Sequence, residues 1–259
     1  QTSFGYKIHS SIQEIDLNFD IEKLKKEIFS LLLTQKYGYK NISLRLTEND
    51  DSWDDQKKAL TETAFSTHCV VSDLSDRTMV PENYTKWHPG LPVNSYVSTV
   101  SKKIEEYLGL NVFKVSLRWM TPQEKYRLHA DIEPCRIHIP LITNDRVWFI
   151  TEEKIHKMRY GKAYHLLPTI EHAVINYGST PRLHLVFSTY LNNEIMEKML
   201  ELADVDVVQD NLFSSVEKDS GIDLQSLAYL LKIDKDSTEE HRKFGPEVIE
   251  VIKEYLTTK

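Results

Sequence analysis

Apolar residues recur at helical spacing near the start of the chain and alternate like a strand soon afterwards. In residues 17–34 five apolar side chains lie three or four positions apart, which predicts an opening helix with Asp20 as its cap. Residues 41–46 alternate between apolar and polar, as in a half-buried strand. Residues 97–108 have a second helical pattern, and Gly109 follows as a stop signal. The first part of the chain is therefore mainly helical.

From residue 113 onward the pattern changes to short apolar runs separated by turn residues. Seven runs follow one another: 113–120, 126–130, 135–142, 146–150, 163–167, 172–177 and 182–190. Strands at a spacing of about 8–12 residues are typical of antiparallel sandwiches and jelly-roll barrels. The predicted fold class is α+β, with a double-stranded β-helix (jelly-roll, cupin-like) core, N-terminal helices and a helical C-terminal cap.

The last part of the chain differs from the rest in both periodicity and charge. Helical patterns return at 192–203, 209–216, 222–232 and 246–257. Residues 191–259 hold 16 of the 39 acidic and 8 of the 32 basic residues, which leaves 23 acidic and 24 basic residues for 1–190. We therefore expect two parts, a jelly-roll domain with N-terminal helices (1–190) and an acidic helical region (191–259).

Composition excludes several classes of protein. A net charge of −7 argues against a nucleic-acid partner, because phosphate binding needs clustered Lys and Arg. No apolar run approaches the roughly 18 residues of a membrane span, so no membrane is expected. Two cysteines, Cys69 and Cys135, do not make a disulfide framework, and a cytoplasmic location is the expectation. The oligomeric state is left open.

The strand-rich block contains six of the ten histidines, and one of them has a carboxylate two residues away. On a strand, His129 and Asp131 project from the same face. Two histidines and one carboxylate with open positions opposite are the ligands of non-haem Fe(II) oxygenases. The third ligand must come from a later strand, where the candidates are His138, His156, His165, His172 and His184.

An arginine decides among these candidates. His172 stands ten residues before Arg182, and residues 176–181 read as the turn between two paired strands. An oxygenase that chelates 2-oxoglutarate needs a guanidinium near the metal for the distal carboxylate of that cosubstrate, and Arg offers a planar bidentate fork. No such Arg follows His184, so His172 is the predicted ligand.

These motifs resemble the aspartyl/asparaginyl β-hydroxylase-like group of Fe(II)/2-oxoglutarate dioxygenases, which includes bacterial proline-type hydroxylases. The resemblance covers roughly residues 113–190. The residues that carry it are His129-Ala-Asp131, Cys135-Arg-Ile-His-Ile-Pro-Leu-Ile-Thr-Asn144, His172-Ala-Val-Ile-Asn176 and Arg182-Leu-His-Leu185. The resemblance implies a hydroxylase that uses Fe(II), 2-oxoglutarate and O₂, with ascorbate as a possible reductant.

By this resemblance each motif residue has an expected role. His129, Asp131 and His172 bind iron, Arg182 binds the distal carboxylate of 2-oxoglutarate, and Arg136 and His138 line the same pocket. Asp131 stands where the animal members have Gly and where halogenases leave room for a halide, so this chain is more similar to the bacterial hydroxylases. The expected reaction hydroxylates an unactivated C–H bond and releases succinate and CO₂.

The substrate is expected to be a small molecule, either an amino acid or a peptide. Arg118 and Arg127 are candidates for its carboxylate, since Arg127 lies two residues before His129 and shares its face by alternation. Trp119, Tyr164 and His165 are candidates for the wall of the substrate site. Two other classes stay open: a cupin-like metal enzyme that is not an oxygenase, such as an isomerase or hydrolase, and a binding module without metal.

Overall fold

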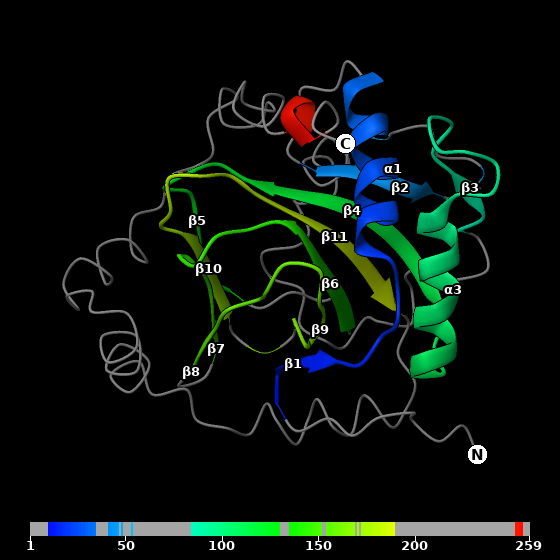
Figure 1. The fold of residues 1–259 in the computed structure, drawn as a ribbon. Helices are drawn as coiled ribbons and strands as arrows, with labels where there is room; N and C mark the ends of the chain where they lie inside the picture. The colour runs from blue at the N-terminus through cyan, green and yellow to red at the C-terminus, as the bar shows by residue number, and fades with distance from the viewer. Residues whose placement is uncertain are drawn as a thin grey trace.

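The computed structural model describes residues 10–34, 41–46, 48, 53, 84–129, 135–151, 154–168, 170, 172–189 and 252–255, with only the backbone described at 41, 127–129 and 154. Two antiparallel sheets form the centre of this part of the chain (Figure 1). The large sheet has seven strands in the order β1 (Ile12–Ile15), β9 (Ala163–Leu166), β6 (Cys135–Ile142), β11 (Arg182–Thr189), β4 (Val112–Met120), β2 (Asn41–Leu46) and β3 (Lys86–Trp87). The small sheet has four, in the order β5 (Lys125–His129), β10 (His172–Asn176), β7 (Val147–Thr151) and β8 (Lys154–His156).

The chain crosses repeatedly between the two sheets. From β4 to β11 the strands belong in turn to the large, small, large, small, small, large, small and large sheets. Four of these eight strands lie in each sheet, and all the pairings are antiparallel. This alternation is the jelly-roll arrangement. The predicted double-stranded β-helix core is therefore confirmed.

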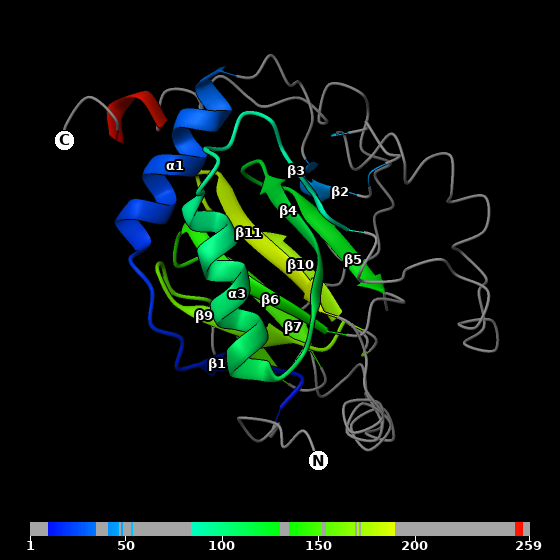
Figure 2. The same cartoon turned by 90° about the vertical axis from the view of Figure 1, so that its right-hand side faces the viewer.

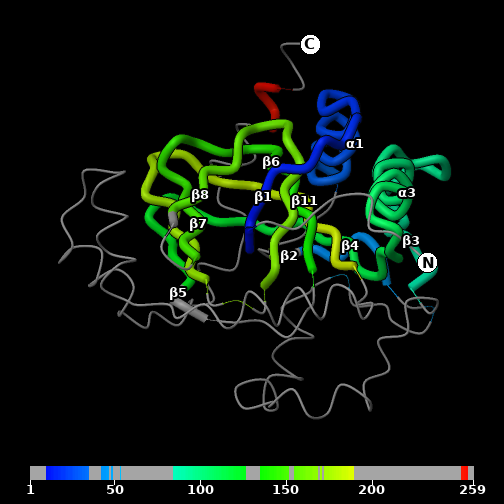
Figure 3. The backbone as a smooth tube through the Cα atoms, turned by 90° about the horizontal axis from the view of Figure 1, so that it is seen from below, coloured from blue at the N-terminus to red at the C-terminus, as the bar shows by residue number. Residues whose placement is uncertain are grey.

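Two helices cover the outer face of the large sheet, on the side away from the small sheet (Figures 2 and 3). The first is α1 (Ile21–Thr34), and Asp20 caps it because its Oδ1 accepts hydrogen bonds from the backbone N–H groups of Glu22 and Lys23, both at 3.0 Å. The second is α3 (Tyr96–Leu108), which ends at Gly109 with a φ of 67°. Both predicted helices are thus present, and α1 begins a few residues later than its pattern suggested.

Strand alternation divides the side chains of the large sheet between two environments. On β11, Leu183, Leu185 and Phe187 are fully buried in the core beneath the helices. The intervening residues, among them Arg182 and His184, project from the opposite face, toward the small sheet. The space between the sheets is therefore lined by polar as well as apolar side chains, and it holds the candidate site.

The seven strands predicted between residues 113 and 190 are all present, and each bound lies within one residue of the prediction. The short strands β1, β3 and β8 were not predicted. Of the predicted C-terminal helices, residues 252–255 form one helical turn and the rest lie outside the described residues. The boundary at residue 190 therefore stays a prediction. Within the described residues, none of the helices is long and apolar enough to span a membrane.

Candidate metal and cosubstrate site

The backbone brings two of the predicted metal-ligand positions together. On the small sheet, His129 at the end of β5 is the direct partner of His172 at the start of β10. Directly opposed residues of antiparallel strands share a sheet face, with Cβ atoms about 4.5–5.5 Å apart. Positions 129 and 172 are therefore suitably spaced for one metal ion. The third predicted ligand, Asp131, and the side chain of His129 lie outside what the structure describes.

His172 has the surroundings expected of a histidine ligand. Its side chain is only 2% exposed, and its Nδ1 lies 2.8 Å from the carbonyl oxygen of Ile170. Because a carbonyl oxygen can only accept, Nδ1 carries the proton and donates, and the lone pair of the neutral ring is on Nε2. Ligand histidines are commonly fixed in this way by a carbonyl group behind the ring.

Arg182 begins the strand that follows β10 and is buried between the sheets. Its side chain is 3% exposed, and its guanidinium carbon lies 5.1 Å from the ring centre of Phe149. Burial lowers the pKa of Arg182 to about 10, an effect opposed by Tyr126 and Glu124. The Nε atom of Arg182 has no hydrogen-bond partner among the described residues. A buried cation with an unused donor is suited to binding an anion.

Two asparagines fix the turn that connects β10 to β11. Asn176 is fully buried, and its side-chain amide donates to the carbonyl groups of Thr121 and Thr180 at 3.1 and 2.9 Å. Its Oδ1 accepts from the Asn144 side-chain amide at 3.2 Å and from the backbone N–H of Gly178 at 3.2 Å. These contacts hold the start of β11, and therefore Arg182, relative to the strand of His172.

Further basic side chains share the inner face of the large sheet. The register pairs Arg118 with His184 and His138 with Val186, so that Arg118, Arg136 and His138 project to the same side as Arg182. His138 is 5% exposed. Its pKa is well below the usual value because of burial first and the nearby Arg182, Arg136 and Arg118 next. The resulting environment is positively charged and suits a dicarboxylate.

Two of the predicted substrate residues face elsewhere. Trp119 is 1% exposed and belongs to the core beneath the helices, since it alternates with Arg118. His165 is paired with Ile137, which places it on that same outer face, where burial lowers its pKa to about 3. The expectation that these two residues line the substrate site is corrected by the alternation of β4 and β9. The side chain of Arg127 lies outside the described part of the chain.

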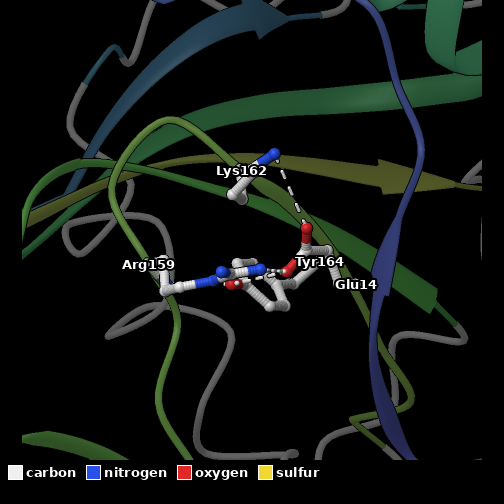
Figure 4. A network of polar contacts seen from close by, with 4 residues as sticks. All are labelled: Glu14, Arg159, Lys162 and Tyr164. Atoms are coloured by element: carbon white, nitrogen blue, oxygen red, sulfur yellow. Dashed lines mark hydrogen bonds and ion pairs between the residues drawn. The ribbon is translucent and has the colours of Figure 1, made fainter.

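Tyr164 projects toward the inner face, but its hydroxyl belongs to a surface network (Figure 4). The hydroxyl donates to Oε2 of Glu14 at 3.2 Å and accepts from the backbone N–H of Arg159 at 2.9 Å. The Arg159 guanidinium lies 2.6 Å from Oε2 of Glu14, and the Lys162 ammonium 3.8 Å from Oε1. Burial alone would raise the pKa of Glu14, but Arg159, Tyr164 and Lys162 together outweigh burial and the pKa is lowered. The hydroxyl of Tyr164 therefore anchors β1 rather than a substrate.

Several residues of the site were not predicted. Phe149 packs its ring against His184 and His138, with centroid distances of 5.9 and 5.5 Å, and Tyr126 lies opposite Val174 beside it. The sequence signal that could have identified them is strand alternation, because Phe149 on β7 and Tyr126 on β5 alternate with residues of the opposite sheet face. Among the described residues, no group of three or more His, Cys, Asp or Glu side chains gathers at a metal-binding spacing.

The family comparison agrees with the motifs. Residues 94–190 match the family described as aspartyl/asparaginyl beta-hydroxylase, a stretch that runs from just before α3 to the end of β11 and contains every motif named above. The predicted resemblance is therefore confirmed over this part, which is less than half of the chain. The sheet topology therefore defines a jelly-roll domain, and residues 94–190 of it are similar to a hydroxylase family.

Solved structures give weaker similarities. A 2OG-Fe(II) oxygenase family oxidoreductase from Burkholderia pseudomallei is 14% identical over 35% of this chain and 49% of its own, with a TM-score of 0.31. A cupin domain from Bordetella pertussis is 20% identical over 30% and 81%, with a TM-score of 0.27. A salicylate 1,2-dioxygenase from Pseudaminobacter salicylatoxidans is 11% identical over 34% and 24%, with a TM-score of 0.26. The chain thus spans about half the length of the first structure.

At TM-scores this low the similarities carry no argument about fold or function, and the fold rests on the sheet topology itself. Comparison with curated proteins gives no match.

Proposed function

We propose that this protein is an Fe(II)- and 2-oxoglutarate-dependent dioxygenase that hydroxylates an unactivated C–H bond of an amino acid, either free or within a peptide. The reaction would consume O₂ and release succinate and CO₂. The observation that carries the proposal is the direct pairing of positions 129 and 172 in one sheet, with the buried Arg182 on the facing sheet. The match of residues 94–190 to a hydroxylase family supports it.

Fe(II) would be held by His129, Asp131 and His172. The donor set suits the metal, because two imidazoles and one carboxylate leave coordination positions open. The His172 ring meets a further requirement, since its Nδ1 donates to the Ile170 carbonyl and its Nε2 bears the lone pair. When bound, the metal would supply the oxidising chemistry with O₂ and the 2-oxo acid, while the protein supplies position and shelter.

2-Oxoglutarate would be held by Arg182 through its distal carboxylate. A guanidinium that is 3% exposed has lost most of its hydration, and an anion of complementary shape would restore the lost interactions. Arg136 and His138 project to the same face and are proposed to line this subsite. The aromatic ring of Phe149 beside the guanidinium limits the directions from which water reaches it.

The substrate carboxylate is proposed to bind Arg118. This side chain shares the inner face with His184, two positions along β4 from Met120, which is fully buried. An apolar cluster between the sheets would exclude water from the reacting C–H bond: Ile12, Met120, Phe149, Met158, Tyr164, Leu166 and Val174. Arg127 is kept as a second candidate on the sequence argument alone.

A succinate-release screen tests the proposal. The protein is incubated with Fe(II), ascorbate, 2-oxoglutarate and either single amino acids or short peptides, and succinate and hydroxylated product are measured together. We expect succinate and hydroxylated product in equal amounts with one class of substrate. Arg182→Ala is the matched variant, and we expect it to need a much higher concentration of 2-oxoglutarate. Substrate turnover that needs no 2-oxoglutarate and is unchanged in Arg182→Ala would instead indicate a cupin-like enzyme that uses no 2-oxo acid.

A further inference from the structure

His184 has a position that neither the metal nor the cosubstrate assignment explains. It follows Arg182 by two residues on β11, so both side chains project between the sheets. His184 is fully buried, and its ring is stacked on Phe149 at an interplanar angle of 13°. Its Nδ1 lies 2.9 Å from Nη2 of Arg182. The histidine therefore contacts the guanidinium directly, on the side of the ring nearest its own backbone.

The direction of this hydrogen bond follows from the chemistry of the two groups. A guanidinium has five donors and no acceptor, so Nδ1 of His184 accepts and its proton is on Nε2. Nδ1 of His138 lies 3.3 Å from Nδ1 of His184. These two nitrogen atoms can form a hydrogen bond only if His138 is the donor. Burial, and after it the charge of Arg182, holds the pKa of His184 well below the usual value. The ring is thus neutral and in one tautomer.

We propose that His184 is a positioning residue for Arg182. Its neutral ring holds one side of the guanidinium, so that the remaining N–H groups are aimed at the distal carboxylate of a five-carbon 2-oxo dicarboxylic acid. The inference rests on the proposed function, because it assumes that Arg182 binds this carboxylate. The Nε donor of Arg182, which has no partner among the described residues, is one of the groups left for the ligand.

Two variants of similar size separate the hydrogen bond from the packing. Asn places its Oδ1 where histidine has Nδ1, so His184→Asn keeps an acceptor for Arg182, whereas His184→Leu keeps the bulk and removes the acceptor. Binding of 2-oxoglutarate and of 2-oxopentanoate, which has the same chain length without the distal carboxylate, is measured anaerobically by calorimetry on the Fe(II)-loaded protein. The comparison of the two acids reports on the distal subsite alone.

We expect His184→Leu to weaken binding of 2-oxoglutarate roughly 10- to 100-fold, the loss typical of a hydrogen bond to a charged group, and that of 2-oxopentanoate by less than about threefold. His184→Asn should stay within about threefold of the wild type for both acids. In turnover measurements, His184→Leu should raise the KM for 2-oxoglutarate and should change kcat less. If His184→Leu does not fold, His184→Gln replaces it, because Gln has no acceptor at the δ position.

Three results would overturn the inference. In the first, His184→Leu weakens the binding of both acids equally, and in the second it weakens the binding of neither. In the third, His184→Asn loses the preference for binding 2-oxoglutarate over 2-oxopentanoate. A wild-type protein that does not prefer 2-oxoglutarate to 2-oxopentanoate would overturn the proposed function itself, so the two failures are distinguishable. Independently, the ¹⁵N NMR spectrum should show the ring of His184 protonated at Nε2, with its signal assigned by its loss in His184→Asn, and a proton on Nδ1 would also overturn the inference.

Discussion

Asn144 and Asn176 join the two sheets at the end of the molecule where Arg182 begins its strand. The side-chain amide of Asn144, which follows β6 of the large sheet, donates to Oδ1 of Asn176, the last residue of β10 in the small sheet, over 3.2 Å. Asn144 also donates to the carbonyl and hydroxyl oxygens of Thr180, both at 3.1 Å. The position of Arg182 relative to His172 therefore depends on two amide side chains that are not among the predicted metal or cosubstrate residues.

Replacing Asn176 with Ala should destabilise the protein by about 2–4 kcal/mol, because the carbonyl groups of Thr121 and Thr180 and the N–H of Gly178 each lose a partner in the buried Asn176 amide, and Asn144 loses one of its acceptors. Urea unfolding at neutral pH measures the change. Thr180→Ala is the control, since it removes an exposed acceptor from the same turn and should change the free energy of unfolding by less than about 0.5 kcal/mol. Equal effects of the two substitutions would show that the buried amide does not hold the turn.

Gly178→Ala should destabilise the same turn for a steric reason. A Cβ added at Gly178 would lie 2.6 Å from Nδ2 of Asn144, so the amide would have to leave its partners. We expect a loss of about 1–3 kcal/mol, as for other overpacked sites. In an Asn144→Ala background the clash is absent, and the same substitution should have little effect. Additive losses in this double-mutant cycle would contradict the explanation.

The end of the chain packs against α1. Ile252 is fully buried in the core beneath the helices, and the hydroxyl of Tyr255 donates to Oε2 of Glu22 at 2.5 Å. Ile252→Ala should therefore lower the free energy of unfolding by about 2–4 kcal/mol. Lys253→Ala, at an exposed position of the same turn, should change it by less than about 0.5 kcal/mol. If Ile252→Ala left the free energy of unfolding unchanged, this turn would not contribute to the core.

Buried histidines should make the metal-free protein sensitive to mild acid. Burial lowers the pKa of His165 to about 3 and of His88 to about 4, and it also lowers those of His138 and His184. In the unfolded chain these rings gain protons below about pH 6.5, so the free energy of unfolding falls as the pH decreases through that value. Each histidine contributes a slope of roughly 1.4 kcal/mol per pH unit once the unfolded chain is fully protonated.

The measurement compares urea unfolding of the wild type and of His165→Leu between pH 6 and pH 5. The variant has one fewer histidine to protonate, so its slope should be smaller by about 1 kcal/mol per pH unit. An unchanged slope would show that His165 titrates equally in the folded and unfolded protein.

The sequence predicted the strands of the jelly roll well because their patterns are local. Strands such as Cys135–Ile142 are bounded by turn residues and carry apolar side chains on the face beneath the helices. The strand Ile12–Ile15 escaped prediction because it has only two apolar residues, and its pairing with β9, about 150 residues away, decides its conformation. Short strands of this kind are set by tertiary contacts rather than by propensity.

The side-chain assignments of the site were predicted less completely. The strand register puts Arg118 and His138 on the inner face, and it puts Trp119 and His165, which were also expected at the substrate site, on the outer face. The register between distant strands is not contained in any single segment of sequence. The contact between Asn144 and Asn176 and that between Arg182 and His184 depend on it too.

Anaerobic titration of the metal-free protein with Fe(II) tests the central claim most directly, namely that His172 is a ligand of one iron ion beside Arg182. We predict binding of about one Fe(II) per chain by the wild type, and a loss of at least roughly 100-fold in affinity in His172→Ala, since removing even an outer partner of a ligand weakens metal binding 10- to 100-fold. His165→Leu, a buried histidine on the other face of the large sheet, should bind iron like the wild type. Wild-type affinity for iron in a folded His172→Ala protein would contradict the account.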